Sequence, residues 1–210
     1  MPSGFSPDFR AELHNLMRLR RDVRRFRTDP IEAAVLDRCL SAFNLAPSVG
    51  LSEPWRLIEV TSEAARGAAM ANFRSVNGQA LAGYCDEKAE LYASLKLSGM
   101  QEAPVHLAIF SDEATAQGSG LGAGTMPETR AYSVVGAIAL FWLAARAEGL
   151  GVGWVSILDP VRLAQDLDVP DTWRLIGYLC VGWPASYSDT PELERAGWET
   201  RRPVLWKEPR

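Results

Sequence analysis

Cysteine and histidine are scarce in this chain of 210 residues, and their scarcity argues against several kinds of site. Only Cys39, Cys85 and Cys180 are present, with no Cys-x-x-Cys spacing, so the sequence favours neither a disulfide scaffold nor structural zinc. His14 and His106 are too few for a histidine-rich metal centre. We therefore expect no metal site and a reducing, cytoplasmic location.

Long apolar runs and an excess of positive charge are also missing. The N-terminal segment from Met1 to Pro7 has no apolar core of the kind that a secretion signal needs. The longest apolar run, Val134 to Ala145, is shorter than the roughly 20 residues that span a bilayer. The formal net charge is -4. We therefore expect no membrane and no nucleic-acid partner.

Hydrophobic residues make up 47% of the chain, which is enough for a sizeable core, and no linker divides it. We expect a single domain over residues 1–210 with about four strands and five or six helices in mixed order. The tail, about residues 183–210, has little periodicity but contains Trp183, Trp198 and Trp206. We expect this tail to pack on a second subunit.

Apolar spacing and capping residues place the expected elements. Ser6 fits a helix N-cap with Pro7 at the first helical position. Further helices are expected over residues 31–45, 62–70, 86–100, 131–148 and 161–167. Strands are expected over residues 55–61, 104–111, 152–157 and 173–181. The glycine-rich residues 112–127 are expected to form a mobile loop.

The most informative segment is Arg20-Arg21-Asp22-Val23-Arg24, which follows the first helix. Guanidinium groups present planar donors that fit phosphate oxygens, so the cluster indicates a bound phosphoester. The alternative is a solvated helix end, where arginines favour the negative end of the helix dipole. Asp22 weakens a phosphate site unless its carboxylate faces another part of the ligand.

Three further features could meet the same ligand. The loop Ser48-Val49-Gly50 is either a simple connection or a clamp for a planar polar ligand. The glycines of residues 149–153 leave room for backbone near a flat ligand, but they follow a helix and precede a strand, the reverse of the dinucleotide-binding order. Lys96 is either a solvent-facing helical residue or a donor to an anionic ring oxygen. Ser156 has no His–Asp partners nearby in sequence for a hydrolase triad.

Together these segments resemble the nitroreductase-like flavoproteins, and more narrowly the BluB-type 5,6-dimethylbenzimidazole synthases. The matching motifs, within a resemblance from about Leu16 to Trp198, are Arg-Arg-Asp-Val-Arg, Ala-Pro-Ser-Val-Gly followed by Pro-Trp, and Ala-Glu-Gly-Leu-Gly-Val-Gly-Trp-Val-Ser. Asp22 separates the branches, because ordinary nitroreductases usually carry serine there. The resemblance implies an α+β fold, with a central mixed sheet flanked by helices, in an intertwined homodimer with two FMN sites at its interface.

The activity that this resemblance implies is the oxygen-dependent fragmentation of reduced FMN. The products are 5,6-dimethylbenzimidazole, the lower ligand of vitamin B12, and erythrose 4-phosphate. O2 is the co-substrate, and an external flavin reductase would supply the FMNH2. Asp22 and Ser156 match the residues associated with fragmentation and also with flavin binding. The other flavin-binding positions implied are Arg20, Arg21, Val23, Arg24, Ser48, Val49, Gly50, Lys96, Leu97, Gly153, Trp154, Val155 and Arg201.

Several other functions remain open at this point. The chain could be an NAD(P)H-dependent nitro- or quinone reductase, a cob(II)yrinic acid a,c-diamide reductase, a non-catalytic FMN-binding protein, or a dimeric scaffold without cofactor. Two departures from the family pattern stand out: Glu53 replaces a usual glutamine, and Ala139-Leu140 replace a polar pair. We expect residues 77–84 to form a lid over the site.

Overall fold

A four-stranded sheet of order β1-β2-β4-β3 forms the centre of the computed structural model, which describes residues 4–210. Its strands are β1 (Trp55–Glu59), β2 (Val105–Asp112), β3 (Gly151–Val155) and β4 (Trp173–Gly182). All neighbouring strands pair antiparallel. The expectation about a secretion signal falls partly on the first three residues, which lie outside the description.

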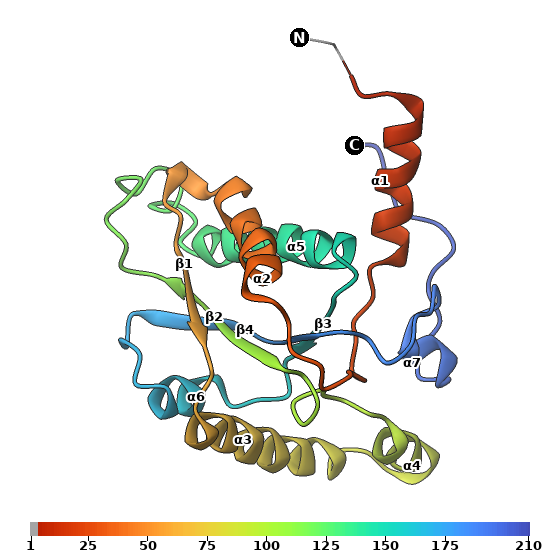
Figure 1. Ribbon diagram of the computed structural model, residues 1–210. Helices are drawn as coiled ribbons and strands as arrows, with labels where there is room; N and C mark the ends of the chain where they lie inside the picture. The colour runs from red at the N-terminus through yellow and green to blue at the C-terminus, as the bar shows by residue number, and fades with distance from the viewer. Residues whose placement is uncertain (1–3) are drawn as a thin grey trace.

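Helices cover both faces of this sheet (Figure 1). On one face lie α2 (Ala33–Leu40), the 3₁₀-helices η1 (Ser41–Leu45) and η2 (Val49–Leu51), and α5 (Thr129–Ala147). On the other face lie α3 (Glu63–Leu81), α4 (Asp86–Ser94) and α6 (Pro160–Asp166). The α+β class predicted from the sequence is therefore confirmed. The sheet is antiparallel rather than mixed, because all three of its strand pairings are antiparallel. Among the described residues, the isolated bridge between Asp22 and Val152 is parallel, and it lies outside the named strands.

The strand β2 shows why the core has two layers. Val105, Leu107 and Ile109 pack in the cluster that contains α2 and α5, whereas Ala108 and Phe110 pack in the cluster that contains α3 and α6. Successive side chains of a strand point to opposite faces, so a strand covered on both sides becomes apolar throughout. This explains the continuous apolar run that the sequence shows in this strand.

Local signals set several helix ends as predicted. In α1 (Pro7–Leu19), the Ser6 hydroxyl accepts a hydrogen bond from the Phe9 amide at 3.1 Å. The helix α5 ends before Gly149, whose φ of +84° suits a glycine. Within the described residues, α5 alone has the length and apolarity of a membrane span, but seven of its residues are buried against the rest of the protein, as in a core helix.

Two helices differ from the sequence prediction because tertiary contacts override weak local signals. The helix α3 continues through Leu81, beyond the expected end at residue 70. Its Asn72 is buried and exchanges two hydrogen bonds with the Asp159 backbone, at 2.9 and 2.8 Å. As a result, the first five residues of the expected lid are helical. The helix α4 ends at Ser94 instead of residue 100, and the chain then runs extended from Leu95.

The tail contains one element that the sequence did not predict, the short helix α7 (Glu192–Arg195). Two of the three tail tryptophans pack within their own chain. Trp183 contacts the core, and its indole N–H donates to the Pro30 carbonyl at 3.2 Å. Trp198 packs edge-on against Tyr84, with ring centroids 5.6 Å apart. Trp206 remains 76% exposed. Packing of the tail on a second subunit stays a prediction.

One buried polar pair ties β2 to β4. The His106 side chain is 1% exposed, and its Nδ1 lies 2.8 Å from the Tyr178 hydroxyl. Burial, and next the positive charge of Arg66, lower the pKa of His106 from 6.5 to about 4. The imidazole is therefore neutral in the folded protein at neutral pH.

We predict that this histidine makes the fold acid-sensitive. Its pKa is lower in the folded state, so the unfolded chain binds the extra proton and stability falls as the pH drops from 6.5 towards 4. Urea unfolding should show a loss of about 1–2 kcal/mol between pH 7.5 and pH 5. The loss should shrink in a His106→Gln variant, and an equal loss in that variant would contradict the assignment.

Candidate functional site

The segment Asp22–Phe26 crosses the end of the sheet at very short range. The Val23 amide donates to the Val152 carbonyl at 3.0 Å, beside the isolated bridge formed by Asp22. A Cβ atom on Gly153 would lie 2.1 Å from the Val23 carbonyl oxygen. The space that Gly151 and Gly153 leave open is therefore filled by the chain itself, at Val23.

This crossing fixes the carboxylate of Asp22 through both of its oxygens. Oδ1 accepts a hydrogen bond from the Trp154 amide at 2.9 Å, and Oδ2 accepts one from Nε of Arg24 at 2.8 Å. The Asp22 side chain is still 31% exposed. The carboxylate is thus held in one orientation while part of it stays accessible to a ligand.

Three other arginines surround a cavity of about 150 Å³ next to Asp22. Arg20 and Arg21 come from the end of α1, and Arg201 comes from the tail. Burial, and then the charge of Arg201, lower the pKa of both Arg20 and Arg21. Asp22 and Glu192 also line this cavity, but its four arginines outnumber the two carboxylates, so its net positive charge favours an anion.

An aromatic hollow of about 400 Å³ adjoins the arginines. Trp142 of α5 and Trp154 of β3 form part of its wall, with ring centroids 6.3 Å apart. The guanidinium of Arg20 lies 4.7 Å from the centre of the Trp142 ring, and the indole N–H of Trp142 donates to the Arg21 carbonyl at 3.2 Å. Its other lining residues are Met17, Val135, Ala139 and Leu143. A flat apolar group bound there would lie directly beside the arginine-lined cavity.

Lys96 reaches the same neighbourhood, but not from a helix as predicted. It lies in the extended chain after α4, and its carbonyl accepts a hydrogen bond from Nη1 of Arg24 at 3.2 Å. Its ammonium group forms an ion pair with Glu102. The next residue, Leu97, is half-buried. Lys96 is therefore linked to Asp22 through Arg24.

The loop Ser48-Val49-Gly50 lies elsewhere in the chain. The Val49 amide donates to the Ser133 hydroxyl at 3.0 Å, near the start of α5, whereas the arginines meet this helix at Trp142. Nine residues of helix correspond to about 13 Å. Gly50 instead packs on the glycine-rich loop, where a Cβ would lie 2.8 Å from the Leu121 carbonyl oxygen. A single chain therefore does not bring this loop to the arginines.

The remaining predicted residues follow β3. Val155 is 3% exposed, so its side chain belongs to the core. Ser156 is exposed and directly follows the last residue of the strand. It lies two positions after Trp154, whose amide binds Asp22. Asp22 and Ser156, which the family resemblance links to fragmentation, thus lie near one end of β3.

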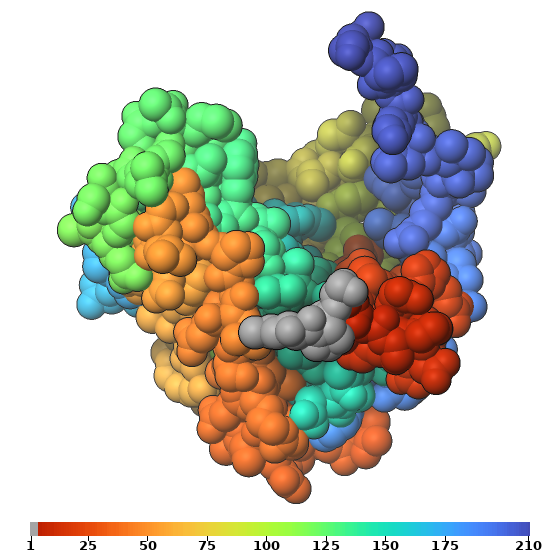
Figure 2. All heavy atoms as spheres, turned by 90° about the horizontal axis from the view of Figure 1, so that it is seen from above, coloured from red at the N-terminus to blue at the C-terminus, as the bar shows by residue number. Residues whose placement is uncertain are grey.

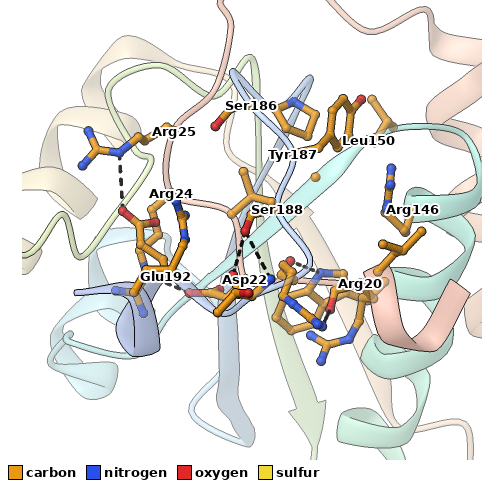
Figure 3. Close-up of a pocket in the computed structure, with 18 residues that line it drawn as sticks. Arg20, Asp22, Arg24, Arg25, Arg146, Leu150, Ser186, Tyr187, Ser188 and Glu192 are labelled. Atoms are coloured by element: carbon orange, nitrogen blue, oxygen red, sulfur yellow. Dashed lines mark hydrogen bonds and ion pairs between the residues drawn. The ribbon is translucent and has the colours of Figure 1, made fainter. Parts of the chain in front are cut away.

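Besides the predicted Arg201, the tail supplies a wall from residues 184–195 that the sequence analysis did not assign to the site. A second cavity, of about 60 Å³, lies between residues 19–25 and residues 184–195 (Figure 3). Arg25 forms an ion pair with Glu192 at 3.4 Å, and Nε of Arg21 donates to the Asp189 carbonyl at 3.1 Å. Backbone carbonyls and single surface acids carry no sequence signature. Of the site residues that the sequence analysis missed, Trp142 carries a recognisable signal, because it is an aromatic residue in the apolar helix α5.

Fold and site together define an α+β protein with an arginine-lined cavity beside an aromatic hollow. The chain belongs to the nitroreductase family, whose family model matches residues 17–183. Its curated relatives include the 5,6-dimethylbenzimidazole synthase of Rhodospirillum rubrum, 54% identical, with 95% of this chain and 94% of the relative aligned. A protein of the same name from Rhodobacter capsulatus is 46% identical, with 97% and 99% aligned. These findings confirm the family resemblance and the prediction that the chain is an enzyme.

Solved structures confirm the fold. Iodotyrosine deiodinase, in a crystal structure bound to FMN and 3-iodo-L-tyrosine, superposes with a TM-score of 0.74 at 23% sequence identity. The alignment covers 94% of this chain and 99% of that one. A nitroreductase-like protein from Bacillus cereus gives a TM-score of 0.60 at 17% identity, covering 97% of this chain and 94% of that one.

We predict that Gly153→Ala disrupts the site through packing alone. The new methyl group would collide with the Val23 carbonyl, so urea unfolding should show a loss of about 1–3 kcal/mol. Gly67→Ala is the matched control, because Gly67 lies in α3 with open space around its Cβ position. That change should stabilise the protein by up to about 1 kcal/mol. Equal stability of the Gly153→Ala variant and the wild type would refute the close crossing.

Proposed function

We propose that this enzyme fragments reduced FMN with O2, giving 5,6-dimethylbenzimidazole and erythrose 4-phosphate for the lower ligand of cobalamin. The observation that carries the proposal is the carboxylate of Asp22, oriented by the Trp154 amide and Arg24 at the edge of an arginine-lined cavity. The close relatives named 5,6-dimethylbenzimidazole synthase support this reaction.

The residues present fit FMN at both ends of the molecule. The mutual repulsion of Arg20, Arg21 and Arg201 would be relieved by the charge of a phosphate group. The hollow beside Trp142 and Trp154 is apolar and aromatic, as a flavin ring requires. When bound and reduced, FMN supplies the electrons that react with O2.

The protein contributes orientation, proton handling and shielding from water. The fixed carboxylate of Asp22 can accept or return a proton at its exposed edge. The Ser156 hydroxyl, at the end of β3, can donate to or accept from a polar ring atom. Lys96 and Leu97, in the extended chain after α4, would approach the ring. Val23 and Gly153 would hold the crossing of residues 22–26 over β3 in place. The apolar hollow would exclude water from the reacting ring.

The principal alternative is an NAD(P)H-dependent reductase, including the nitro-, quinone and cob(II)yrinic acid a,c-diamide reductase activities. A relative from Thermus thermophilus that is 29% identical is named NADH dehydrogenase. A carboxylate held beside the ring gives a hydride-transfer enzyme no evident advantage, so Asp22 favours fragmentation. We further propose that a separate flavin reductase supplies the reduced FMN and that the enzyme works in the cytoplasm.

We also propose that the enzyme acts as a homodimer whose second subunit completes the FMN site. The apolar face of α1 is uncovered: Phe9, Leu13 and Met17 are 38–47% exposed, and Phe5, just before the helix, is 70% exposed. In Figure 2, the surface of α5 is visible between α1 and the segment of residues 31–50. Val135 of this surface is 44% exposed and lines the aromatic hollow. Apolar area of this kind calls for a partner, and a second copy could bring its Ser48-Val49-Gly50 loop to the ring.

We predict that Asp22→Asn separates flavin binding from fragmentation. Purified protein is mixed with chemically reduced FMN in air, and 5,6-dimethylbenzimidazole is measured by mass spectrometry. Loss of the proton-transferring carboxylate should lower the rate by about 100-fold or more while FMN binding persists. Ser156→Gly should also slow product formation. Asp166→Asn, which alters a surface ion pair with Arg162, is the control and should leave the rate unchanged.

The same assay distinguishes the alternatives. Oxidation of NADPH without this product would support a reductase, and a yellow but inert protein would support a non-catalytic flavin binder. Unchanged rates in both the Asp22→Asn and Ser156→Gly variants would refute the assigned roles.

We predict that Val135→Glu weakens both the dimer and FMN binding, because it places a charge in the uncovered apolar surface. Sedimentation equilibrium should show that the dimer dissociation constant rises by about tenfold or more, and the affinity for FMN should fall in parallel. Val161→Glu is the matched control, since Val161 lies on α6 and is 66% exposed. A wild-type protein that is monomeric when saturated with FMN would contradict the proposed assembly.

A further inference from the structure

Arg24 differs from the other arginines of the site in the partners of its guanidinium group. Its side chain is only 15% exposed. Nε donates to Oδ2 of Asp22 at 2.8 Å, and Nη1 donates to the Lys96 carbonyl at 3.2 Å. Arg21 also directs its donors at the protein, but at the backbone carbonyls of Arg20 and Asp189, whereas Arg24 is in direct contact with a carboxylate that lines the arginine cavity.

The charges around the cavity separate Arg24 from its neighbours. Burial, and then the charge of Arg201, lower the pKa of Arg20 and of Arg21, and all three arginines line one cavity, so their charges lie close together. The charge of Arg24 is instead balanced by the carboxylate of Asp22 in direct contact. The unbalanced positive charge that would attract a phosphate therefore belongs to the other three arginines.

The carbonyl that anchors Arg24 is itself held firmly. The Lys96 ammonium pairs with Glu102, and the Glu102 amide donates to the Gly99 carbonyl at 3.2 Å. Gly99 is packed so tightly that a Cβ atom there would lie 2.2 Å from the Phe26 ring. Phe26 belongs to the same segment as Arg24. The turn of residues 96–102 and the segment of residues 22–26 thus fix each other.

From these contacts we infer that Arg24 is a positioning residue for Asp22 rather than a phosphate ligand. Its planar guanidinium spans two acceptors, the Asp22 carboxylate and the Lys96 carbonyl, and so sets the angle of the carboxylate. An ammonium group on a flexible chain cannot reproduce this fork. The inference rests on the proposed function for the role of Asp22 in the reaction, but the absence of a phosphate contact can be tested by binding alone.

The binding test compares FMN with riboflavin, which lacks the phosphate. Dissociation constants of the apoprotein for both ligands are measured by quenching of flavin fluorescence. Arg201→Gln, the matched control, should lower the preference for FMN by about tenfold or more, because it removes a charged donor. Arg24→Gln and Arg24→Lys should keep the wild-type preference within about twofold. A loss of preference in both Arg24 variants as large as in Arg201→Gln would overturn the inference.

The second test measures product formation at saturating reduced FMN. Arg24→Lys keeps the charge but loses the fork, so its rate should fall by about tenfold or more while the Arg201→Gln rate recovers at saturation. In an Asp22→Asn background, Arg24→Lys should cause no further loss, because the group that it positions is gone. An additive loss in the double variant, or an unchanged rate in Arg24→Lys, would count against the positioning role.

The two tests fail in distinguishable ways. A wild-type protein that prefers FMN to riboflavin but makes no 5,6-dimethylbenzimidazole would refute the proposed reaction. The ligand preference of the Arg24 variants would still show whether Arg24 contacts the phosphate. Circular dichroism of each variant checks that it is folded, and Arg24→Lys serves as the milder change.

Discussion

The close crossing of residues 22–26 over β3 is the constraint on which the candidate site depends. Only glycine at position 153 lets the Val23 carbonyl approach the strand, and the approach brings Asp22 within hydrogen-bonding distance of the Trp154 amide. Arg24 and the arginine cavity follow from the same path of the chain. A displacement of this crossing by one ångström would move Asp22 and Arg24 together with the neighbouring Arg20 and Arg21, since all four belong to one short segment.

The helix α5 shows how a core element can also shape a site. Its inward side chains, such as Val134 and Phe141, are fully buried against the sheet. Its outward residues Ala139 and Trp142 form the aromatic hollow. Ala139 belongs to the pair where the family resemblance leads us to expect polar residues. As an apolar residue it forms part of the wall of the hollow, beside Trp142, which contacts Arg20 and Arg21.

Sequence patterns predicted the strands, the capped start of α1 and the buried α5, because these depend on local residues and on a strong apolar signal. The ends of α3 and α4 were missed because Asn72, Gly99 and their distant partners decide them. The family motif indicated Asp22 and the arginines. The partners that orient them, such as the Lys96 carbonyl and the Asp189 carbonyl, come from backbone positions that no residue pattern marks.

The helix α1 has a consequence for how the protein responds to its own concentration. None of its described residues is buried, yet it leads without a linker into Arg20 and Arg21. In the dimer proposed above, a contact that immobilised α1 would also restrict these arginines, so dimer formation and anion binding would be coupled. Such coupling is reciprocal: a ligand that orders the arginines strengthens assembly by the same factor. Apparent ligand affinity would then rise with protein concentration, which would make the amount of enzyme in the cell a regulator of its own saturation.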